Sequence, residues 1–145
     1  MSSPKQYCTF TLAGLLFGIE VDRVQEVIRS LELTTVPLAN DVVEGLINLR
    51  GQIVTALDLR RRLELPPRTD GEQPMNIVVR VGDGALSLLV DAIGDVVDVD
   101  EDSFEAAPET LEGVARELIR GAYKLDGRLL LVLDTDRAVA LPAAA

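Results

Sequence analysis

The sequence predicts a mainly β fold, a barrel-like arrangement of short strands with small helical connectors. Three observations predict it. β-branched residues recur in short runs, and such residues favour strands over long helices. Glycine turns separate many of these runs at intervals of roughly ten residues, a spacing typical of all-β sandwiches and barrels. The sequence shows no strand–helix–strand repeats of the length that a parallel sheet requires.

The first two predicted strands form a hairpin. Gln6–Leu12 alternates well enough for a strand, and Leu15–Glu20 is expected to pair with it across the Ala13-Gly14 turn. Asp22 then resembles a helix N-cap, because Gln25 follows three residues later as in a capping box. The sequence therefore predicts a short helix after the hairpin, with one face made of Val24, Val27 and Ile28.

A second hairpin is predicted in the middle of the chain. Gly45–Leu49 and Gln52–Leu57 are expected to be strands joined by a tight turn at Arg50-Gly51, where glycine takes the positive φ that other residues resist. Four less regular elements surround this hairpin: extended structure over Leu31–Val36 that stops at Pro37, a linking piece over Ala39–Leu46, a helical turn over Asp58–Leu63 and a surface loop over Leu65–Pro74.

Two further hairpins are predicted in the second half. Met75–Val81 pairs with Ala85–Asp91, and Leu118–Leu125 pairs with Arg128–Leu133 over Asp126-Gly127, a favoured type I′ turn pair. The other expected elements are a strand over Val96–Val99, a short helix near Thr110–Val114 and a last helical turn over Thr135–Val139 capped by Asp134. We expect one domain over residues 1–145, with residues 1–5 and 141–145 frayed.

The charge of the chain limits the partners that it can bind. The net charge is −10, which disfavours nucleic acid and anionic membranes. Acidic residues dominate between Asp91 and Glu117, whereas basic residues outnumber acidic ones between Arg50 and Arg80. The pattern indicates either a solvated acidic face or a molecule whose electrically distinct ends suit two different partners.

The single cysteine and the absence of apolar spans indicate the cytoplasm. Cys8 has no second cysteine to pair with, which fits a reducing compartment. The polar first residues lead straight into a strand, so we expect no signal peptide. No apolar run approaches the roughly 20 residues that a membrane helix needs.

The residue types also argue against catalysis. The chain has no histidine, so the usual general base and the commonest metal ligand are missing. Cys8 lies in a strand without a visible activating neighbour. Neighbouring acids such as Asp98 and Asp100 form a run of like charge typical of hydrated surface, and no calcium-loop glycine or glutamate follows them. We therefore expect no cofactor and no metal, and we rank an enzyme that uses paired carboxylates below a binding module.

One segment is similar to a known family. Residues 42–54, V-V-E-G-L-I-N-L-R-G-Q-I-V, followed by L-D-L-R at 57–60, resemble the hallmark of the CheW-like domain family of bacterial chemotaxis coupling proteins. Other family motifs appear in the right order: F-G-I-E-V at 17–21, V-Q-E-V-I at 24–28, V-P at 36–37, L-V-D at 89–91, D-V at 95–96, and the closing hairpin from Gly121 to Asp134. Ser87 and Ala56 depart from the family pattern.

The resemblance implies both a fold and a function. The implied fold is two intertwined five-stranded SH3-like β-barrels with short connecting helices and a groove between them. The implied function is a non-catalytic adaptor, without a cofactor, that couples methyl-accepting chemoreceptors to the histidine kinase CheA; alone it would be a monomer, and with its partners it would assemble into arrays. Two alternatives stay open within the family: an adaptor of another chemosensory pathway, such as twitching motility or development, and a regulator that sequesters CheA.

The resemblance also implies two sets of partner-binding residues. The receptor set is Val24, Gln25, Glu26, Val27, Arg50 and Val90, and the kinase set is Leu38, Val42, Val43 and Leu57. A guanidinium such as that of Arg50 can bind a carboxylate or several carbonyls in a fixed fork. Arg50 therefore has two interpretations, as a residue that pins one barrel to the other or as a receptor contact. The apolar members of both sets are also reasonable core residues.

Overall fold

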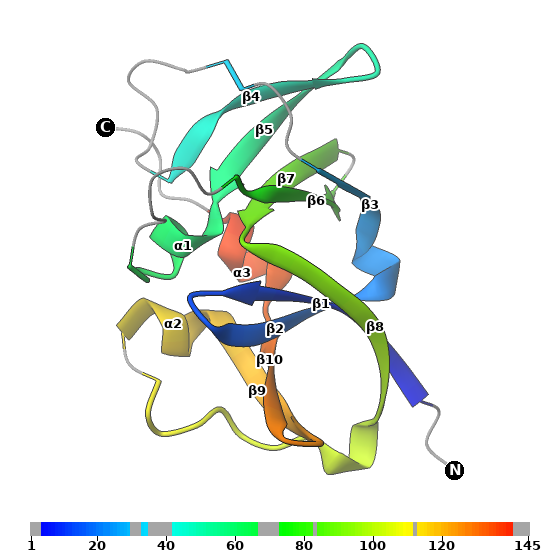
Figure 1. Cartoon of the computed structure of the whole chain (residues 1–145), viewed down its shortest axis with the longest axis vertical. Coiled ribbons are helices and arrows are strands. Elements are labelled where there is room, and N and C mark those ends of the chain that lie inside the picture. The colour runs from blue at the N-terminus through cyan, green and yellow to red at the C-terminus, as the bar shows by residue number, and fades with distance from the viewer. Residues whose placement is uncertain are drawn as a thin grey trace.

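Strands make up most of the described part of the chain. The computed structural model describes residues 4–29, 33–34, 42–66, 73–82, 84–111 and 113–140. Within these ranges the strands form two five-stranded sheets, sheet A and sheet B, which lie one above the other along the long axis of the molecule (Figure 1). The predicted mainly β fold is confirmed. The expected loop residues 67–72, the tail residues 141–145 and most of the expected extended segment over Leu31–Val36 lie outside the described residues. Pro4 and Lys5, which were expected to be frayed, belong to the first strand, and residues 1–3 lie outside the described residues.

Sheet A combines the two ends of the chain. Its strand order is β8-β1-β2-β10-β9, and its only parallel pair is β2 with β10. The strands are β1 (Pro4–Leu12), β2 (Leu15–Glu20), β8 (Ala92–Asp100), β9 (Ile119–Leu125) and β10 (Arg128–Leu133). Both hairpins predicted for this sheet are confirmed, and β8 is longer than the predicted strand over Val96–Val99.

Sheet B is built from the middle of the chain. Its order is β3-β6-β7-β5-β4, again with one parallel pair, β5 with β7. The strands are β3 (Val24–Ile28), β4 (Val43–Leu49), β5 (Gln52–Asp58), β6 (Met75–Val81) and β7 (Gly84–Val90). The chain thus passes from sheet A to sheet B and back, which is the intertwined arrangement that was expected.

Short helices occupy the connections. They are η1 (Val21–Arg23), α1 (Leu59–Arg62), η2 (Glu101–Ser103), α2 (Gly113–Leu118) and α3 (Thr135–Val139). The carboxylate of Asp58 accepts a hydrogen bond from the Arg60 amide at the start of α1, and Asp134 caps α3 in the same way through the Arg137 amide. The helical turns predicted over Asp58–Leu63 and Thr135–Val139 are confirmed, whereas α2 begins later than the helix predicted near Thr110–Val114.

The helix predicted after Asp22 is wrong. Only one 3₁₀ turn follows the first hairpin; no side chain caps it, and Val24–Ile28 is strand β3, paired with β6. The capping-box pattern is a local signal, and here the pairing of β-branched residues with a neighbouring strand outweighs it. Gln25 and Val27 therefore lie on the exposed face of a strand while Val24, Glu26 and Ile28 are partly buried.

The two sheets curl like SH3 barrels without closing. The strand ladders of the described residues leave β8 and β9 as the edges of sheet A, and β3 and β4 as the edges of sheet B. An isolated bridge spans each gap: Thr34, beyond β3, pairs with Leu46 in β4, and Glu105, beyond β8, pairs with Ala122 in β9. The SH3-like arrangement that was expected is therefore present, with a single bridge in place of a ladder across each gap.

The two halves of the chain repeat one order of elements. Residues 4–62 contain hairpin β1–β2, strand β3, a bridge residue, hairpin β4–β5 and α1; residues 75–139 contain hairpin β6–β7, strand β8, a bridge residue, hairpin β9–β10 and α3. In each half the first hairpin joins one sheet and the next three strands join the other. The sequences agree in places, with V-D-R-V-Q-E-V at 21–27 and V-D-A-I-G-D-V at 90–96.

Apolar side chains fill three regions. The largest cluster lies between the sheets and takes Phe10 and Phe17 from sheet A and Ile77 and Leu88 from sheet B. A smaller cluster lies inside the curl of each sheet. Apolar side chains are therefore buried on both sides of each sheet.

Both departures from the family pattern fit the core. Ala56 is fully buried in the interior of sheet B. The Ser87 hydroxyl donates a 2.8 Å hydrogen bond to Oδ1 of Asn76, and both side chains are buried. At the equivalent position of sheet A, Gly18 packs against Tyr7, where a Cβ would lie 3.2 Å from that of Tyr7. Serine is tolerated in sheet B because its neighbour is smaller and polar.

Candidate partner-binding surface

The tip of hairpin β4–β5 presents Arg50 to solvent. Arg50 and Gly51 both have positive φ, +53° and +88°, which is the backbone that a two-residue type I′ hairpin turn requires. The Gly51 amide donates a 2.8 Å hydrogen bond to Oδ1 of Asn48, which fixes the turn. The N-L-R-G motif thus folds into a rigid turn, and 77% of the Arg50 side chain is exposed.

Arg50 and Glu26 form a two-pronged ion pair. The guanidinium Nη1 lies 2.8 Å from Oε2 of Glu26, and Nη2 lies 2.9 Å from Oε1. Only 19% of the Glu26 side chain is exposed, because the bulge in β3 directs it inwards. β3 and β4 are opposite edges of sheet B, so this pair spans the gap between them. We name the Glu26–Arg50 pair the fork.

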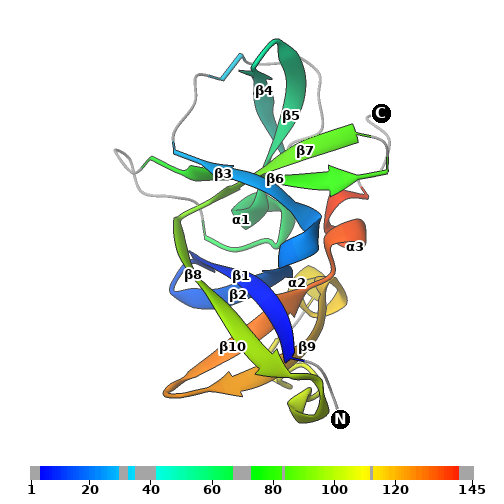
Figure 2. The same ribbon diagram turned by 90° about the vertical axis from the view of Figure 1, so that its right-hand side faces the viewer.

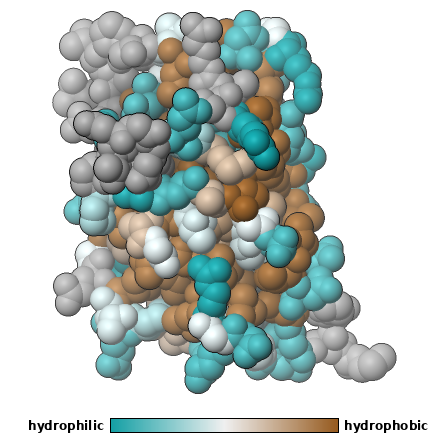
Figure 3. Space-filling model, in the orientation of Figure 1, coloured by the Kyte–Doolittle hydropathy of each residue, from teal (hydrophilic) through white to brown (hydrophobic). Residues whose placement is uncertain are grey.

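Exposed valines lie beside the gap on both sheets. Val27 in β3 is 39% exposed, and Val96 in β8 is 54% exposed. The two occupy equivalent positions of the repeated V-D-x-x-x-x-V pattern. β3 and β8 both lie on the right-hand side of Figure 1 and face the viewer in Figure 2. In Figure 3 hydrophobic surface covers the middle and right-hand part of the face shown, with hydrophilic residues towards its periphery.

The structure separates the predicted receptor residues into two groups. It brings Glu26 and Arg50 into contact and leaves Gln25 and Val27 exposed in the same strand. Val24 is partly buried and packs on the core between the sheets, and Val90 is fully buried. A side chain without accessible surface cannot touch a partner, so Val90 contributes packing.

The predicted kinase residues also divide by burial. Leu57 is 1% exposed and belongs to the core between the sheets. Val42 and Val43 are partly buried against the same core, and the Val42 carbonyl accepts a hydrogen bond from the Asp58 amide. Leu38 lies outside the described residues. Of this set, only the two valines offer accessible surface within the described part of the chain.

Two exposed residues were missed by the sequence reasoning. Ile53 in β5 is 61% exposed, although its place in an apolar strand gave no reason to expect this. Val96 was part of a recognised motif without being assigned a role. The repeat of V-D-x-x-x-x-V at 21–27 and 90–96 is the signal that could have identified Val96 as the counterpart of Val27.

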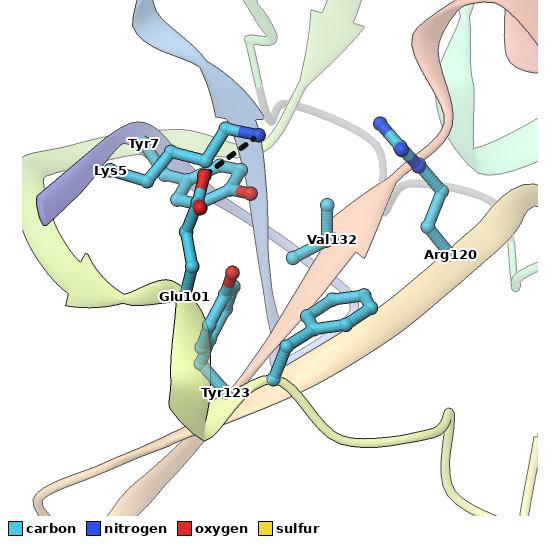
Figure 4. Close-up of a pocket in the computed structure, with 7 residues that line it drawn as sticks. Lys5, Tyr7, Glu101, Arg120, Tyr123 and Val132 are labelled. Atoms are coloured by element: carbon cyan, nitrogen blue, oxygen red, sulfur yellow. Dashed lines mark ion pairs between the residues drawn. The ribbon is translucent and has the colours of Figure 1, made fainter. Parts of the chain in front are cut away.

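A small cavity at the open end of sheet A collects most of the aromatic residues. It measures about 180 Å³ and is lined by Lys5, Tyr7, Glu101, Phe104, Arg120, Tyr123 and Val132 (Figure 4). The ring centroids of Tyr7 and Tyr123 lie 5.6 Å apart, and those of Phe104 and Tyr123 lie 5.1 Å apart. Lys5 and Arg120 both pair with Glu20, at 3.3 and 3.5 Å. The cations of the cavity are therefore already engaged.

Two groups of β1 resist ionisation because they are buried. Burial raises the pKa of the Tyr7 phenol above its ordinary value, so the phenol stays protonated at neutral pH. Cys8, also in β1, is buried, and burial raises the pKa of its thiol. In the ranges that the structure describes, no group of three or more His, Cys, Asp or Glu side chains is arranged to hold a metal ion.

Of the helices that the structure describes, none is long and apolar enough to cross a membrane.

Comparisons with known proteins agree with this geometry. The family model described as the CheW-like domain matches residues 6–142. The chain is 31% identical over 127 residues to the chemotaxis protein CheW of Bacillus subtilis, covering 88% of this chain and 81% of that protein. It is 29% identical over 133 residues to CheW of Treponema pallidum, covering 89% and 78%. The crystal structure of the scaffolding protein TtCheW from Thermoanaerobacter tengcongensis superposes with a TM-score of 0.86 at 28% identity, covering 96% of this chain and 94% of that one.

Proposed function

The chain belongs to the CheW-like domain family and is a chemotaxis coupling adaptor, and we propose that it joins methyl-accepting chemoreceptors to the histidine kinase CheA. The observation that carries the proposal is the fork. Its two residues were assigned to one receptor surface from separate family motifs, they lie 24 positions apart, and they meet at the surface of sheet B.

The proposed receptor surface extends from sheet B to sheet A. It consists of the fork, Gln25 and Val27 on β3, and Val96 on β8. Two exposed valines beside a charged rim suit the apolar stripe of a helical hairpin, the form in which receptors of this class present their cytoplasmic tip. The valines supply apolar contact, and the fork supplies orientation and selectivity, as charges at an interface rim usually do.

The proposed kinase surface lies on sheet B alone. Ile53 is its most exposed apolar residue in the described part of the chain, and Val42 and Val43 add partial surface at the other end of the β4–β5 hairpin. An exposed isoleucine on a two-stranded tip can insert between apolar residues of the regulatory domain of CheA. Because Arg50 forms the turn of the same hairpin, one rigid element would contact both partners.

The proposed role requires no catalytic activity. The chain has no histidine, and the cations that line the aromatic cavity are engaged in ion pairs. We place the protein in the cytoplasm, where receptor tips and CheA meet, as a monomer that is recruited into arrays. Array assembly strengthens modest individual contacts through effective concentration.

The first experiment is a pull-down of the chain with the CheA regulatory domain and, separately, with a receptor cytoplasmic hairpin. Binding of both supports the adaptor. Binding of the kinase domain alone supports a regulator that sequesters CheA. Binding of neither contradicts the proposal. Receptors from flagellar and non-flagellar pathways, tested side by side, distinguish the two adaptor alternatives.

The second experiment tests the fork. Arg50→Glu places two carboxylates opposite each other, so receptor affinity should fall roughly tenfold, or about 1.4 kcal/mol. Receptor-dependent kinase activation should fall with it. The control is the double variant Glu26→Arg, Arg50→Glu, which rebuilds the ion pair in the opposite direction. Normal receptor affinity in Arg50→Glu, with normal folding, would mean that the fork has no part in receptor binding.

A further inference from the structure

α3 has no strong hold on the molecule of its own. It is only five residues long, and a helix this short is not stable without contacts. It follows β10, a strand of sheet A, and packs against α2, and its last turn also contacts Arg62 of α1, which follows β5 of sheet B (Figure 1). Thr135 and Ala138 are its buried residues, and such small side chains leave its orientation weakly determined. Ala138 and Val139 pack on the core between the sheets, and polar contacts add direction to this packing.

Arg62 of α1 provides these contacts. Its Nε donates a 2.8 Å hydrogen bond to the carbonyl oxygen of Ala138. Its Nη2 donates to the carbonyl oxygens of Arg137 and Ala140, at 2.9 and 3.3 Å. These carbonyls belong to the last turn of α3, where a helix lacks internal donors and carries partial negative charge. One planar guanidinium thus satisfies three backbone acceptors across the boundary between the sheets.

Arg23 adds a second connection to the same helix. It forms a 2.8 Å ion pair with Asp136 of α3 and donates to the carbonyl oxygen of Arg80 in β6, which belongs to sheet B. Asp136 is 75% exposed, so this pair contributes little by itself. It nevertheless directs α3 towards sheet B from the other side of Arg62.

The bonds from Arg62 act at a different place from the other connections between the sheets. The packed core sets the general orientation of the two sheets, and the Arg60–Asp91 pair joins α1 to the β1–β2 turn through the Ala13 amide. The bonds from Arg62 are directional and join an element of one sheet to an element of the other. The receptor surface proposed above spans both sheets, with Val27 on β3 and Val96 on β8, whereas the kinase surface lies on sheet B.

We propose that Arg62 is a positioning residue for receptor coupling: by fixing α3 against α1 it sets the angle between the sheets, and so the spacing of Val27 and Val96. This inference rests on the proposed function. It gives a role to Arg62, which belongs to neither of the predicted partner-binding sets. Loss of Arg62 should lower the affinity for the receptor, which would touch both sheets. It should leave the affinity for the CheA regulatory domain, which would touch sheet B alone, unchanged.

The test measures both affinities in Arg62→Gln, with the receptor hairpin and the CheA regulatory domain as probes. We expect receptor affinity to fall about fivefold or more, the range of a typical coupling between sites, and kinase-domain affinity to stay within about twofold. Arg61→Gln is the matched control on the same helix, because Arg61 pairs with Glu44 and Asp58, both in its own half of the chain. Arg61→Gln should change neither affinity.

Each other result has a definite meaning. Unchanged receptor affinity in Arg62→Gln overturns the role of Arg62, and so does a parallel loss of both affinities, which indicates general destabilisation. If Arg62→Gln does not fold, Arg62→Lys is judged by the same criteria, since lysine keeps the charge but cannot reach three carbonyls in one plane. A natural chain that binds neither probe overturns the proposed function, whereas normal binding by every variant overturns this inference alone.

Discussion

At the scale of single residues, the ion pair between Arg60 and Asp91 connects the two halves of the chain. Nε of Arg60 donates a 2.8 Å hydrogen bond to Oδ1 of Asp91, and Nη2 pairs with Oδ2. The side chains are only 11% and 17% exposed. Asp91 also accepts a bond from the Ala13 amide at the β1–β2 turn. Removing Arg60 would take the opposite charge away from a carboxylate that is largely shielded from water, and a backbone amide does not replace that charge.

Arg60→Met should therefore destabilise the protein by about 3 kcal/mol or more, because the Asp91 carboxylate would lose its ionic partner in a site shielded from water. Urea unfolding at neutral pH measures this change in the free energy of unfolding. The control, Arg61→Met, alters a neighbour that is 55% exposed and should change stability by less than about 1 kcal/mol. Equal losses in the two variants would contradict the special place of Arg60.

The sequence predicted the kind of contact that Arg50 makes, but it did not predict that Glu26 is the residue contacted. A guanidinium at a hairpin turn can bind either several carbonyls or a carboxylate, and in the structure Arg50 binds the Glu26 carboxylate. Glu26 was assigned to the same surface, but their contact depends on sheet B curling until β3 approaches the tip of β4–β5, which no local pattern encodes. The sequence left the burial of Val90 and Leu57 open between core and partner contact, and the structure places both in the core between the sheets.

At the scale of elements, two glycines permit the bridges that complete each curl. A Cβ on Gly45 would lie 2.5 Å from the carbonyl oxygen of Thr34, and a Cβ on Gly121 would lie 2.5 Å from that of Glu105. The two glycines occupy equivalent places at the start of β4 and β9. The same residue type is needed twice because the same close approach of two backbones occurs twice.

Gly45→Ala and Gly121→Ala should each destabilise the protein by about 1–3 kcal/mol, since a backbone carbonyl must move to admit the methyl group. Thermal unfolding followed by circular dichroism gives the comparison. Gly84→Ala is the control, because its Cβ would meet only one atom, at 3.8 Å, and should change stability by less than about 0.5 kcal/mol. Unchanged stability in Gly45→Ala and Gly121→Ala would show that the two backbones can move apart at little cost.

The hairpins were predicted correctly, whereas the helix predicted after Asp22 is a strand. Turn chemistry is local, so Ala13-Gly14, Arg50-Gly51 and Asp126-Gly127 marked three turns correctly. The identity of β3 depends on its pairing with β6, some fifty residues away, where Val27 faces Ile77. A capping pattern over four residues cannot report that pairing. Elements defined by distant neighbours are the ones that sequence reasoning misplaced.

At the scale of the whole molecule, the protein should show little dependence of stability on pH near neutrality. It has no histidine to titrate there. Burial raises the pKa values of Cys8 and Tyr7 from their ordinary 9.0 and 10.0, so the unfolded chain ionises first. Below these ordinary values both states are protonated and stability is constant; above them the unfolded state releases protons and stability falls.

The free energy of unfolding should therefore be level between about pH 6 and 8 and fall above about pH 9. Lys5, whose pKa is raised by its hydrogen bond to Glu20, adds to the fall as it loses its charge at still higher pH. Urea titrations from pH 6 to 10 provide the profile. In Cys8→Ala the decline in the free energy of unfolding should begin at a higher pH, because only the Tyr7 phenol remains to ionise. A slope between pH 6 and 8 in either protein would contradict this account.

The exchange of strands between sheets was available only from the family resemblance. Hairpin positions and the absence of long helices follow from local sequence. That hairpin β1–β2 joins strands from the far end of the chain does not, because several topologies accommodate the same strands.

This exchange of strands sets the order in which the two sheets can fold during synthesis. Every strand of sheet B lies within residues 24–90, so this sheet can form before the ribosome has finished. Sheet A must wait, since β2 lacks its parallel neighbour until residues 130–132 emerge. In the interval the apolar faces of β1 and β2 stay uncovered. The nascent chain is therefore most open to chaperones and to aggregation just before its last hairpin is made.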